Sequence, residues 1–284
     1  MRFFEPFLVF GALMPCLNQA TAEPIDYQLV ERVNISGRQR MLSQMMTKAS
    51  CLAMVGIDPA AHAEQSEKAA DEFDAALRLL RDGDPARGFS SETATDILAA
   101  LSEGQALWDT FGPAVRQLYS GDLHNVVISQ VLDLNLPVLA SMNRIVGLID
   151  KSGGDGGNKG PMAATVDMAG RQRMLSQKMI KELCLIHAEI ETVKQRADLK
   201  ASMDLFDNSL HQLMRGDEAQ NIVGPPNPEV AAHLEEAAAA WADLRRVIEP
   251  VSQGTAPSRL DVEGAARISM ELLTASHKAV VSYL

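Results

Sequence analysis

Eight consecutive residues occur twice in this chain without a single change, and this internal repeat constrains the fold more than any other feature. The octapeptide GRQRMLSQ at residues 37–44 returns at residues 170–177, an offset of 133. The same offset relates other identical residues: Cys51 and Cys184, Phe73-Asp74 and Phe206-Asp207, Leu77 and Leu210, Leu80 and Leu213, Gly83-Asp84 and Gly216-Asp217, and Trp108 and Trp241. Self-similarity at a fixed offset indicates two copies of one structural module.

The boundary between the copies is marked by composition. Residues 151–160 contain five glycines in ten positions, which is typical of a flexible connector. We therefore assign residues 23–150 to a first module and residues 161–284 to a second. Each module is long enough to bury a core of its own.

Within each copy, apolar residues recur at helical spacing, and the low aromatic content of 5% also favours helices over strands. The pattern predicts four helices per copy, over residues 25–55, 60–82, 90–119 and 122–150, and over residues 162–193, 195–214, 228–251 and 258–283. Four helices with short connections favour an antiparallel bundle. The predicted fold class is all-α, with two tandem antiparallel four-helix bundles related by pseudo-two-fold symmetry. Pro113 and Pro137 fall inside predicted helices, where we expect a kink or an early end.

The first 22 residues have the features of a secretory signal peptide. Arg2 precedes an apolar stretch over residues 7–17, and a small-residue cleavage site ends at Ala22. Cys16 offers a lipoprotein alternative, which the Met-Pro before it fits poorly. No later stretch reaches the roughly 18 apolar residues that a membrane span requires. The sequence thus predicts a soluble protein in the periplasm or outside the cell.

Charge and motif content exclude several functional classes. The net charge of -11 argues against binding to nucleic acid, because neutralising phosphates requires a basic face. None of the six histidines lies in a zinc, di-iron or haem attachment motif, and the chain has no phosphate-binding glycine loop or nucleophile elbow. We expect no metal, no cofactor and no enzymatic activity.

The retained octapeptide places an arginine and a glycine on one side of a helix. At about 100° per residue, Gly37, Arg40, Met41 and Gln44 share a face. A glycine inside a helix costs roughly 0.5 to 1 kcal/mol relative to alanine. Its compensating role is either close approach of another backbone or space for the arginine one turn later.

Two interpretations of the motif side chains remain open at this point. Arg40 and Arg173 either form a binding site or are surface or interface arginines whose stems pack on apolar neighbours. The adjacent polar residues either line a site or satisfy backbone groups: Ser43, Gln44, Ser176 and Gln177.

The stretch Asn34–Gln44, and its copy from Asp167, resemble the signature of the PilJ-like sensory domain in type IV pilus methyl-accepting chemotaxis transducers. They are also similar to the first-helix motif of the periplasmic sensor domain in nitrate/nitrite-sensing histidine kinases. In those kinases two chains place this helix side by side, and one arginine from each chain binds a shared nitrate. The resemblance implies that Arg40 and Arg173 bind an anion, with Gly37 and Gly170 lining the helix crossing. It also implies a membrane-bound kinase or chemotaxis transducer as partner.

A tandem duplication can supply within one chain the two-fold arrangement that a homodimer supplies from two. Facing guanidinium groups repel each other unless an anion lies between them, and each planar fork matches a planar oxyanion. We expect nitrate, nitrite or a small carboxylate at a site made by Gly37, Arg40, Ser43 and Gln44 with their copies Gly170, Arg173, Ser176 and Gln177. The alternative is a non-sensing interaction protein whose arginine-bearing helices dock an acidic partner.

The two repeat-related cysteines are candidates for a disulfide. Each follows its motif arginine by eleven residues, which is about 20° from the same helix face and roughly 16 Å further along. If the two first helices run parallel with their arginines facing each other, Cys51 and Cys184 face each other too, and an exported compartment oxidises them. The alternative is a pair of reduced, buried core cysteines.

Overall fold

The computed structural model describes residues 27–119, 125–152 and 161–284, and in these ranges the chain folds into α-helices and two single-turn 3-10 helices, without strands. The predicted all-α fold class is confirmed. The expected signal peptide with Cys16, the break at residues 120–122 and most of the glycine-rich connector lie outside the described residues. The helices are α1 (Tyr27–Met54), α2 (Pro59–Asp82), η1 (Pro85–Arg87), α3 (Thr95–Tyr119), α4 (Asn125–Ser152), α5 (Pro161–His187), α6 (Thr192–Arg215), η2 (Glu218–Gln220), α7 (Pro228–Ser252) and α8 (Arg259–Tyr283).

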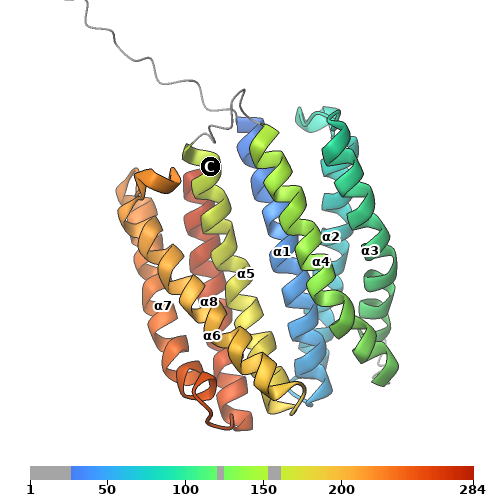
Figure 1. The fold of residues 1–284 in the computed structure, drawn as a ribbon, viewed down its shortest axis with the longest axis vertical. Coiled ribbons are helices and arrows are strands. Elements are labelled where there is room, and N and C mark those ends of the chain that lie inside the picture. The colour runs from blue at the N-terminus through green and yellow to red at the C-terminus, as the bar shows by residue number, and fades with distance from the viewer. Residues whose placement is uncertain (1–26, 120–124, 153–160) are drawn as a thin grey trace, which may run out of the picture.

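The helices form two bundles that stand side by side (Figure 1). In the first bundle α1 packs against α2 and α4, and α3 closes the ring by packing against the same two helices. In the second bundle α5 packs against α6 and α8, and α7 closes the ring. The most extensive contact between any two helices in the described ranges joins α1 to α5. The junction between the bundles is therefore a major part of the core.

Helices α1 and α5 run in the same direction. In their N-terminal halves, Arg40 Nη2 lies 2.6 Å from Asp167 Oδ1. Near their C-terminal ends, the Cα atoms of Cys51 and Cys184 are 6.1 Å apart. The two cysteines are equivalent under the 133-residue repeat, whereas Arg40 contacts the residue six positions before its own equivalent, Arg173. Both contacts join corresponding halves of α1 and α5, so the two helices lie parallel and side by side.

A second group of repeated residues fixes the inside of each bundle. In the first bundle the rings of Phe73 and Trp108 stack with 4.4 Å between centroids, and Trp108 Nε1 donates to Asp74 Oδ1 at 3.2 Å. The second bundle repeats the ring contact at 4.6 Å and the hydrogen bond at 2.6 Å, through Phe206, Trp241 and Asp207. These residues join α2 to α3 and α6 to α7, which explains their retention in both copies.

The start of the third helix was predicted too early. Helix α3 begins at Thr95 rather than at residue 90. The preceding residues form a compact loop instead, in which Asp84 N and Phe89 O hydrogen-bond at 2.7 Å and Gly88 has a positive φ of 69°. Glu92 Oε1 then accepts from the backbone N–H groups of Thr93 and Ala94, which ends the loop.

The break between α5 and α6 was also misplaced. Helix α5 ends at His187 rather than at residue 193, and α6 begins at Thr192 rather than at residue 195. Glu189 and Glu191 take positive φ angles of 58° and 45°. The equivalent positions of the first copy, Gly56 and Asp58, have φ angles of 73° and 37°. The second copy therefore retains the turn geometry, although it has Glu189 where the first copy has the glycine that indicates a turn.

The two prolines that were expected to kink or end their helices do not end them. Helix α3 continues through Pro113 to Tyr119, and α4 continues through Pro137 to Ser152. Each helix spans more than three turns on one side of its proline, and packing against neighbouring helices offsets the hydrogen bond that proline removes.

One helix contradicts the expectation that no later segment is apolar enough to cross a membrane. Residues Val127–Ser152 of α4 are long enough and include an 18-residue window with a mean hydropathy of 1.2. By length and composition alone this is weak evidence for a membrane span, because the core helix of a soluble protein meets the same criteria; 39% of the window is buried in this structure. The sequence reasoning erred because α4 intersperses apolar residues with a few charged ones, such as Asp133 and Arg144, instead of forming one uninterrupted run.

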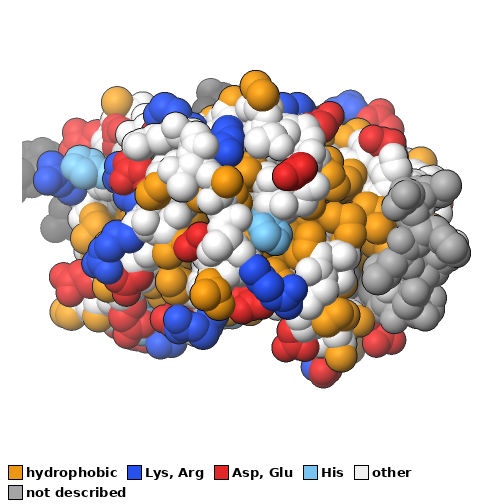
Figure 2. All heavy atoms as spheres, turned by 90° about the horizontal axis from the view of Figure 1, so that it is seen from below, with side chains coloured by type: hydrophobic (Ala, Val, Ile, Leu, Met, Phe, Trp, Pro, Cys, Tyr) orange, Lys and Arg blue, Asp and Glu red, His pale blue; other side chains and the backbone are white. Residues whose placement is uncertain are grey.

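Among the described residues, the lower end of the molecule in Figure 1 has no continuous basic surface. Seen from below, acidic and basic side chains are intermixed, and hydrophobic side chains gather toward one side (Figure 2). Many of the charges are paired along single helices, as in Arg267 with Glu271 and Lys200 with Asp204. Exposed pairs of this kind contribute little to stability.

The positive φ of Glu189 leads to a testable prediction. A left-handed conformation disfavours a residue with a Cβ atom, so Glu189→Gly should raise the free energy of unfolding by about 0.5 to 1 kcal/mol. The matched control is Gly56→Ala, whose new Cβ has only Arg259 Nη1 nearby, at 3.8 Å, so that backbone strain alone should lower stability by about 1 kcal/mol. Urea unfolding measures both changes. A destabilising Glu189→Gly substitution contradicts this account of the turn.

Candidate functional site

The two octapeptides lie in the buried interface between α1 and α5. Arg40 is 2% exposed and Arg173 is 1% exposed. Charged side chains are rarely buried to this extent unless they are paired, because removing a guanidinium from water is costly. The partners of the two arginines therefore define what the site can do.

Arg40 is neutralised by the other bundle. Its Nη2 donates to Asp167 Oδ1 at 2.6 Å, and its Nη1 donates to Asn143 Oδ1 at 3.4 Å. The second oxygen of Asp167 accepts from Arg171 Nη2 at 3.0 Å. Burial alone would raise the pKa of Asp167, but Arg40 and Arg171 together lower it below its ordinary value. Arg40 thus faces an ionised carboxylate that α5 supplies.

Arg173 has neutral hydrogen-bonding partners. Its Nη2 donates to Asn34 Oδ1 at 2.8 Å, and its Nη1 lies 3.4 Å from His277 Nδ1. Its Nε is buried and has no hydrogen-bond partner among the described residues. Burial, together with the nearby charges of Arg38 and Arg40, lowers the pKa of Arg173 to about 9. No carboxylate in the described ranges is bonded to this guanidinium.

The contacts of the two arginines are reciprocal under the repeat, but their chemistry differs. Asn34 and Asp167 are 133 positions apart, and each receives the arginine of the other helix. One copy supplies an amide and the other a carboxylate. Sequence reasoning did not assign either residue to the site, although their common position three residues before the glycine was a usable signal.

The glycine of each octapeptide makes room for its arginine. A Cβ atom added to Gly37 would lie 3.0 Å from Arg40 Nη2. One added to Gly170 would lie 3.3 Å from Arg173 Nη2 and 3.8 Å from Arg40 Nη2. Of the two roles proposed for the glycine, space for the arginine is therefore the one observed. Since both Nη2 atoms lie close to Gly170, the two guanidinium groups are near neighbours.

The serines and glutamines of the octapeptides lie further along the interface. Ser43 and Ser176 each donate to the backbone oxygen of the arginine three residues earlier, at 2.9 and 2.8 Å. Each serine also accepts from the amide of the following glutamine. The glutamine oxygens accept from lysines of the opposite helix, so these four side chains belong to a different polar layer from the guanidinium groups.

That polar layer contains two buried lysines that the sequence analysis missed. Lys48 Nζ donates to Gln177 Oε1 at 2.8 Å, and Lys181 Nζ donates to Gln44 Oε1 at 3.2 Å and to Asn135 Oδ1 at 3.0 Å. Burial lowers the pKa of Lys48 to about 7 and that of Lys181 to about 8. The lysines also obey the 133-residue offset, which was the signal that could have identified them.

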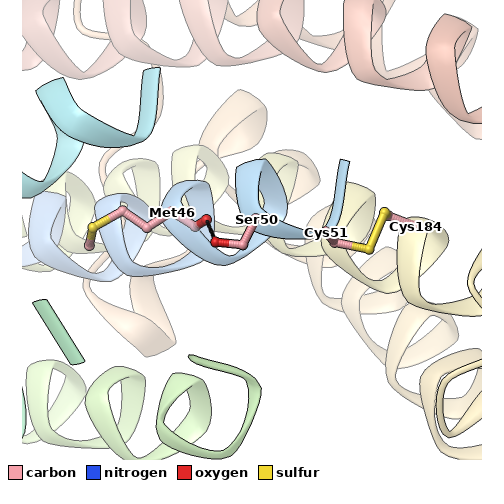
Figure 3. Close-up of a disulfide and its surroundings, with 4 residues drawn as sticks. All are labelled: Met46, Ser50, Cys51 and Cys184. Atoms are coloured by element: carbon pink, nitrogen blue, oxygen red, sulfur yellow. Dashed lines mark hydrogen bonds between the residues drawn. A yellow bond between two sulfur atoms is a disulfide. The ribbon is translucent and has the colours of Figure 1, made fainter. Parts of the chain in front are cut away.

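Beyond the lysines, a disulfide joins the two helices. Cys51 of α1 and Cys184 of α5 point toward one another, and their Sγ atoms are bonded (Figure 3). Both cysteines are buried. The α1–α5 interface therefore has three levels along its length: an arginine pair, a lysine pair and a covalent link.

Two hollows adjoin the arginine level. A groove of about 900 Å³ along the N-terminal part of α1 and the C-terminal part of α2 reaches Asn34 and Arg38, but neither of the two buried arginines lines it. A smaller cavity of about 340 Å³ lies between α1, α2 and α8, and Arg173 and His277 line it. In the part of the chain that the structure describes, no group of three or more His, Cys, Asp or Glu side chains is arranged to hold a metal ion.

Comparison with known families matches both copies of the module. The sequence model of a family described as "Type IV pili methyl-accepting chemotaxis transducer N-term" matches residues 30–134 and again residues 159–263. The chain is also 32% identical over 109 residues to the "Methyl-accepting chemotaxis protein McpN" of Pseudomonas aeruginosa. That match covers 38% of this chain and 20% of the relative, so the matched part is about a fifth of the relative's length.

The cross-link between α1 and α5 is open to direct measurement. Thiol counting on the denatured, unreduced protein should find no free thiol at Cys51 or Cys184, and mass spectrometry should recover a peptide that joins them. A bridge across this sequence separation of 133 residues contributes about 4 to 5 kcal/mol in the chain-entropy model, so the double Cys→Ser variant should lose stability of that order. Two free thiols per chain at these positions would refute the link.

Proposed function

This chain belongs to the family of type IV pili methyl-accepting chemotaxis transducer N-terminal domains, and we propose that it is an exported sensor protein that binds nitrate or nitrite between α1 and α5. In this proposal Arg40 and Arg173 share one anion, and the bound state is presented to a membrane-bound kinase or chemotaxis transducer. Membership of the family supports the signalling role at a general level. The ligand, the export and the partner are our proposals.

The observation that carries the proposal is the buried pair of guanidinium groups contributed by two different bundles. Arg40 Nη2 and Arg173 Nη2 both lie within 4 Å of the position that a Cβ atom of Gly170 would take. Two like charges this close in a buried interface repel each other, and Arg173 has no bonded carboxylate in the described ranges. An anion between the two groups relieves both the repulsion and the uncompensated charge.

The chemistry of the site favours a small planar oxyanion. Each guanidinium offers coplanar N–H donors in a fork that matches the spacing of two oxygens on one planar anion. Even a Cβ atom at Gly37 or Gly170 would lie 3.0 or 3.3 Å from a guanidinium nitrogen, so we propose a small ion for this site. Nitrate and nitrite satisfy both conditions, whereas tetrahedral phosphate or sulfate is larger and is not planar.

Asp167 competes with such a ligand for the guanidinium of Arg40. It already places one carboxylate oxygen on Arg40, and its other oxygen on Arg171. An incoming anion has to replace Asp167 on Arg40, while Arg171 can keep the displaced carboxylate paired. The exchange breaks the Arg40–Asp167 bond between the two bundles and leaves the existing Arg171–Asp167 bond within α5, which is a change that a signalling partner can detect.

The alternative function, docking of an acidic partner helix on an arginine-bearing face, is not favoured by the same side chains. Arg40 and Arg173 are almost fully buried between the two bundles. A partner protein cannot reach them without separating α1 from α5, which the disulfide opposes. Burial therefore supports a small ligand over a protein partner at these arginines.

Isothermal titration calorimetry with nitrate, nitrite, sulfate and acetate tests the proposed function. We expect one nitrate or nitrite per chain, weaker acetate binding and no sulfate binding. Arg40→Lys and Arg173→Lys keep the charge but remove the fork, and each should weaken binding by at least about 2 kcal/mol, or roughly 30-fold. Arg246→Lys is the matched control, because Arg246 is exposed and pairs with Asp243 on α7. Two independent anions per chain, or no binding, would overturn the proposal.

The role of Asp167 predicts opposite effects at the two repeat-related positions. Asp167→Asn removes the competing carboxylate and should raise nitrate affinity at least tenfold. Without nitrate, the same variant should lose roughly 2 to 3 kcal/mol of stability, because Arg40 is then buried without a counter-charge. Asn34→Asp gives Arg173 a carboxylate and should weaken nitrate binding. Unchanged affinity in both variants contradicts the competitor role.

The pH dependence follows from the titration of Arg173, whose pKa is lowered to about 9 by burial and by Arg38 and Arg40. The anion requires the protonated guanidinium, so affinity should be constant between pH 7 and pH 8 and should fall as pH rises through about 9. Burial and the charge of Arg173 also lower the pKa of His277, which is therefore neutral at pH 7. A loss of nitrate affinity as the pH rises from 6 to 7 would show that a protonated histidine is required for binding.

A further inference from the structure

We propose that the cavity between α1, α2 and α8 is a second ligand site, which binds a monocarboxylate with a short apolar body such as benzoate or hexanoate. The cavity shares Arg173 with the proposed nitrate site, but Arg40 does not line it. The proposal does not require that nitrate binds.

Apolar side chains from both bundles line two sides of the cavity. Met41 and Met45 of α1 line one side, and Met270 and Leu273 of α8 line the other. Methionine side chains are flexible and polarizable, so a methionine-lined wall adapts to ligands of different shape. Such a wall contacts hydrocarbon or aromatic groups and offers nothing to a free inorganic ion.

The polar end of the cavity is the guanidinium of Arg173. Its side chain is 1% exposed, and its Nε–H has no acceptor among the described residues. Its Nη1 faces His277, which is neutral at pH 7. A buried donor without an acceptor costs free energy, and a carboxylate oxygen that reaches it recovers that cost.

The remaining charges around the cavity are already balanced. Arg38 Nη2 donates to Glu72 Oε2 at 3.0 Å, and Lys68 pairs with Glu64 of the same helix. Arg173 is therefore the cation of the lining without a bonded carboxylate in the described ranges. Because the other charges of the lining are paired, the cavity with its apolar side chains matches a monoanion with an apolar body.

The size of the cavity supports an organic ligand. Its volume of about 340 Å³ lies at the lower end of the range for small-molecule pockets, about 300 to 1,000 Å³. One water occupies roughly 30 Å³ of liquid, so a nitrate ion would leave most of the space unfilled. A carboxylate with six or seven carbon atoms fills a much larger part of it.

Calorimetry on the full chain tests this site with benzoate and hexanoate as probes and benzyl alcohol as the neutral analogue. Benzoate should bind in a one-to-one complex at least tenfold more tightly than benzyl alcohol. Thr274 lines the cavity and is exposed, so Thr274→Trp should fill the cavity without disturbing the core and should weaken benzoate binding at least tenfold. Nitrate binding should not change in this variant. Val281→Trp, at an exposed position of the same helix outside the lining, is the matched control.

The outcomes separate this proposal from the proposed function. If nitrate binds and benzoate does not, the carboxylate site is wrong and the nitrate site stands. If benzoate binds and nitrate does not, the nitrate site is wrong and the carboxylate site stands. Equal affinity for benzoate and benzyl alcohol, or benzoate binding that Thr274→Trp leaves intact while the melting temperature confirms folding, also overturns the carboxylate site.

Discussion

The packing of α1 against α5 is the contact on which the rest of the molecule depends, and its unusual feature is that its centre is charged. Two arginines and two lysines are buried along one helix interface, where apolar side chains would be easier to accommodate. Each of these cations bonds to a residue of the opposite helix, so the bundles cannot separate without exposing unpaired polar groups. The polar contacts therefore fix the register of the two bundles, and the disulfide holds that register covalently.

The two copies of the module differ where the difference has physical consequences. Asp167 gives Arg40 a carboxylate, whereas Asn34 gives Arg173 only an amide, so two arginines of identical sequence context have different charge environments. Glu189 accepts a left-handed turn that Gly56 adopts without strain. Duplication supplied the geometry of the interface, and later divergence made its two halves chemically unequal.

The sequence was sufficient to predict those structural features that follow from the repeat. The helical modules and the glycines beside the arginines follow from the octapeptide and its offset, and the same offset pointed to Cys51 and Cys184 as facing residues. What could not be predicted depends on contacts between helices or on backbone conformation without a local signal. The turn at Glu189 has no glycine or proline to mark it. The pairing of Arg40 with Asp167 joins residues 127 positions apart, and the burial of Lys48 depends on the second bundle closing over α1.

Because α1 and α5 belong to one chain, the two arginines meet at any protein concentration. A site assembled from two identical chains fills only where the chains associate, and its apparent affinity falls on dilution. A tethered and cross-linked pair has a fixed, high effective concentration, so its occupancy responds to ligand concentration alone. A binding site built on such a pair keeps its affinity even when only a few copies of the chain are present, which a site in a dissociating homodimer does not.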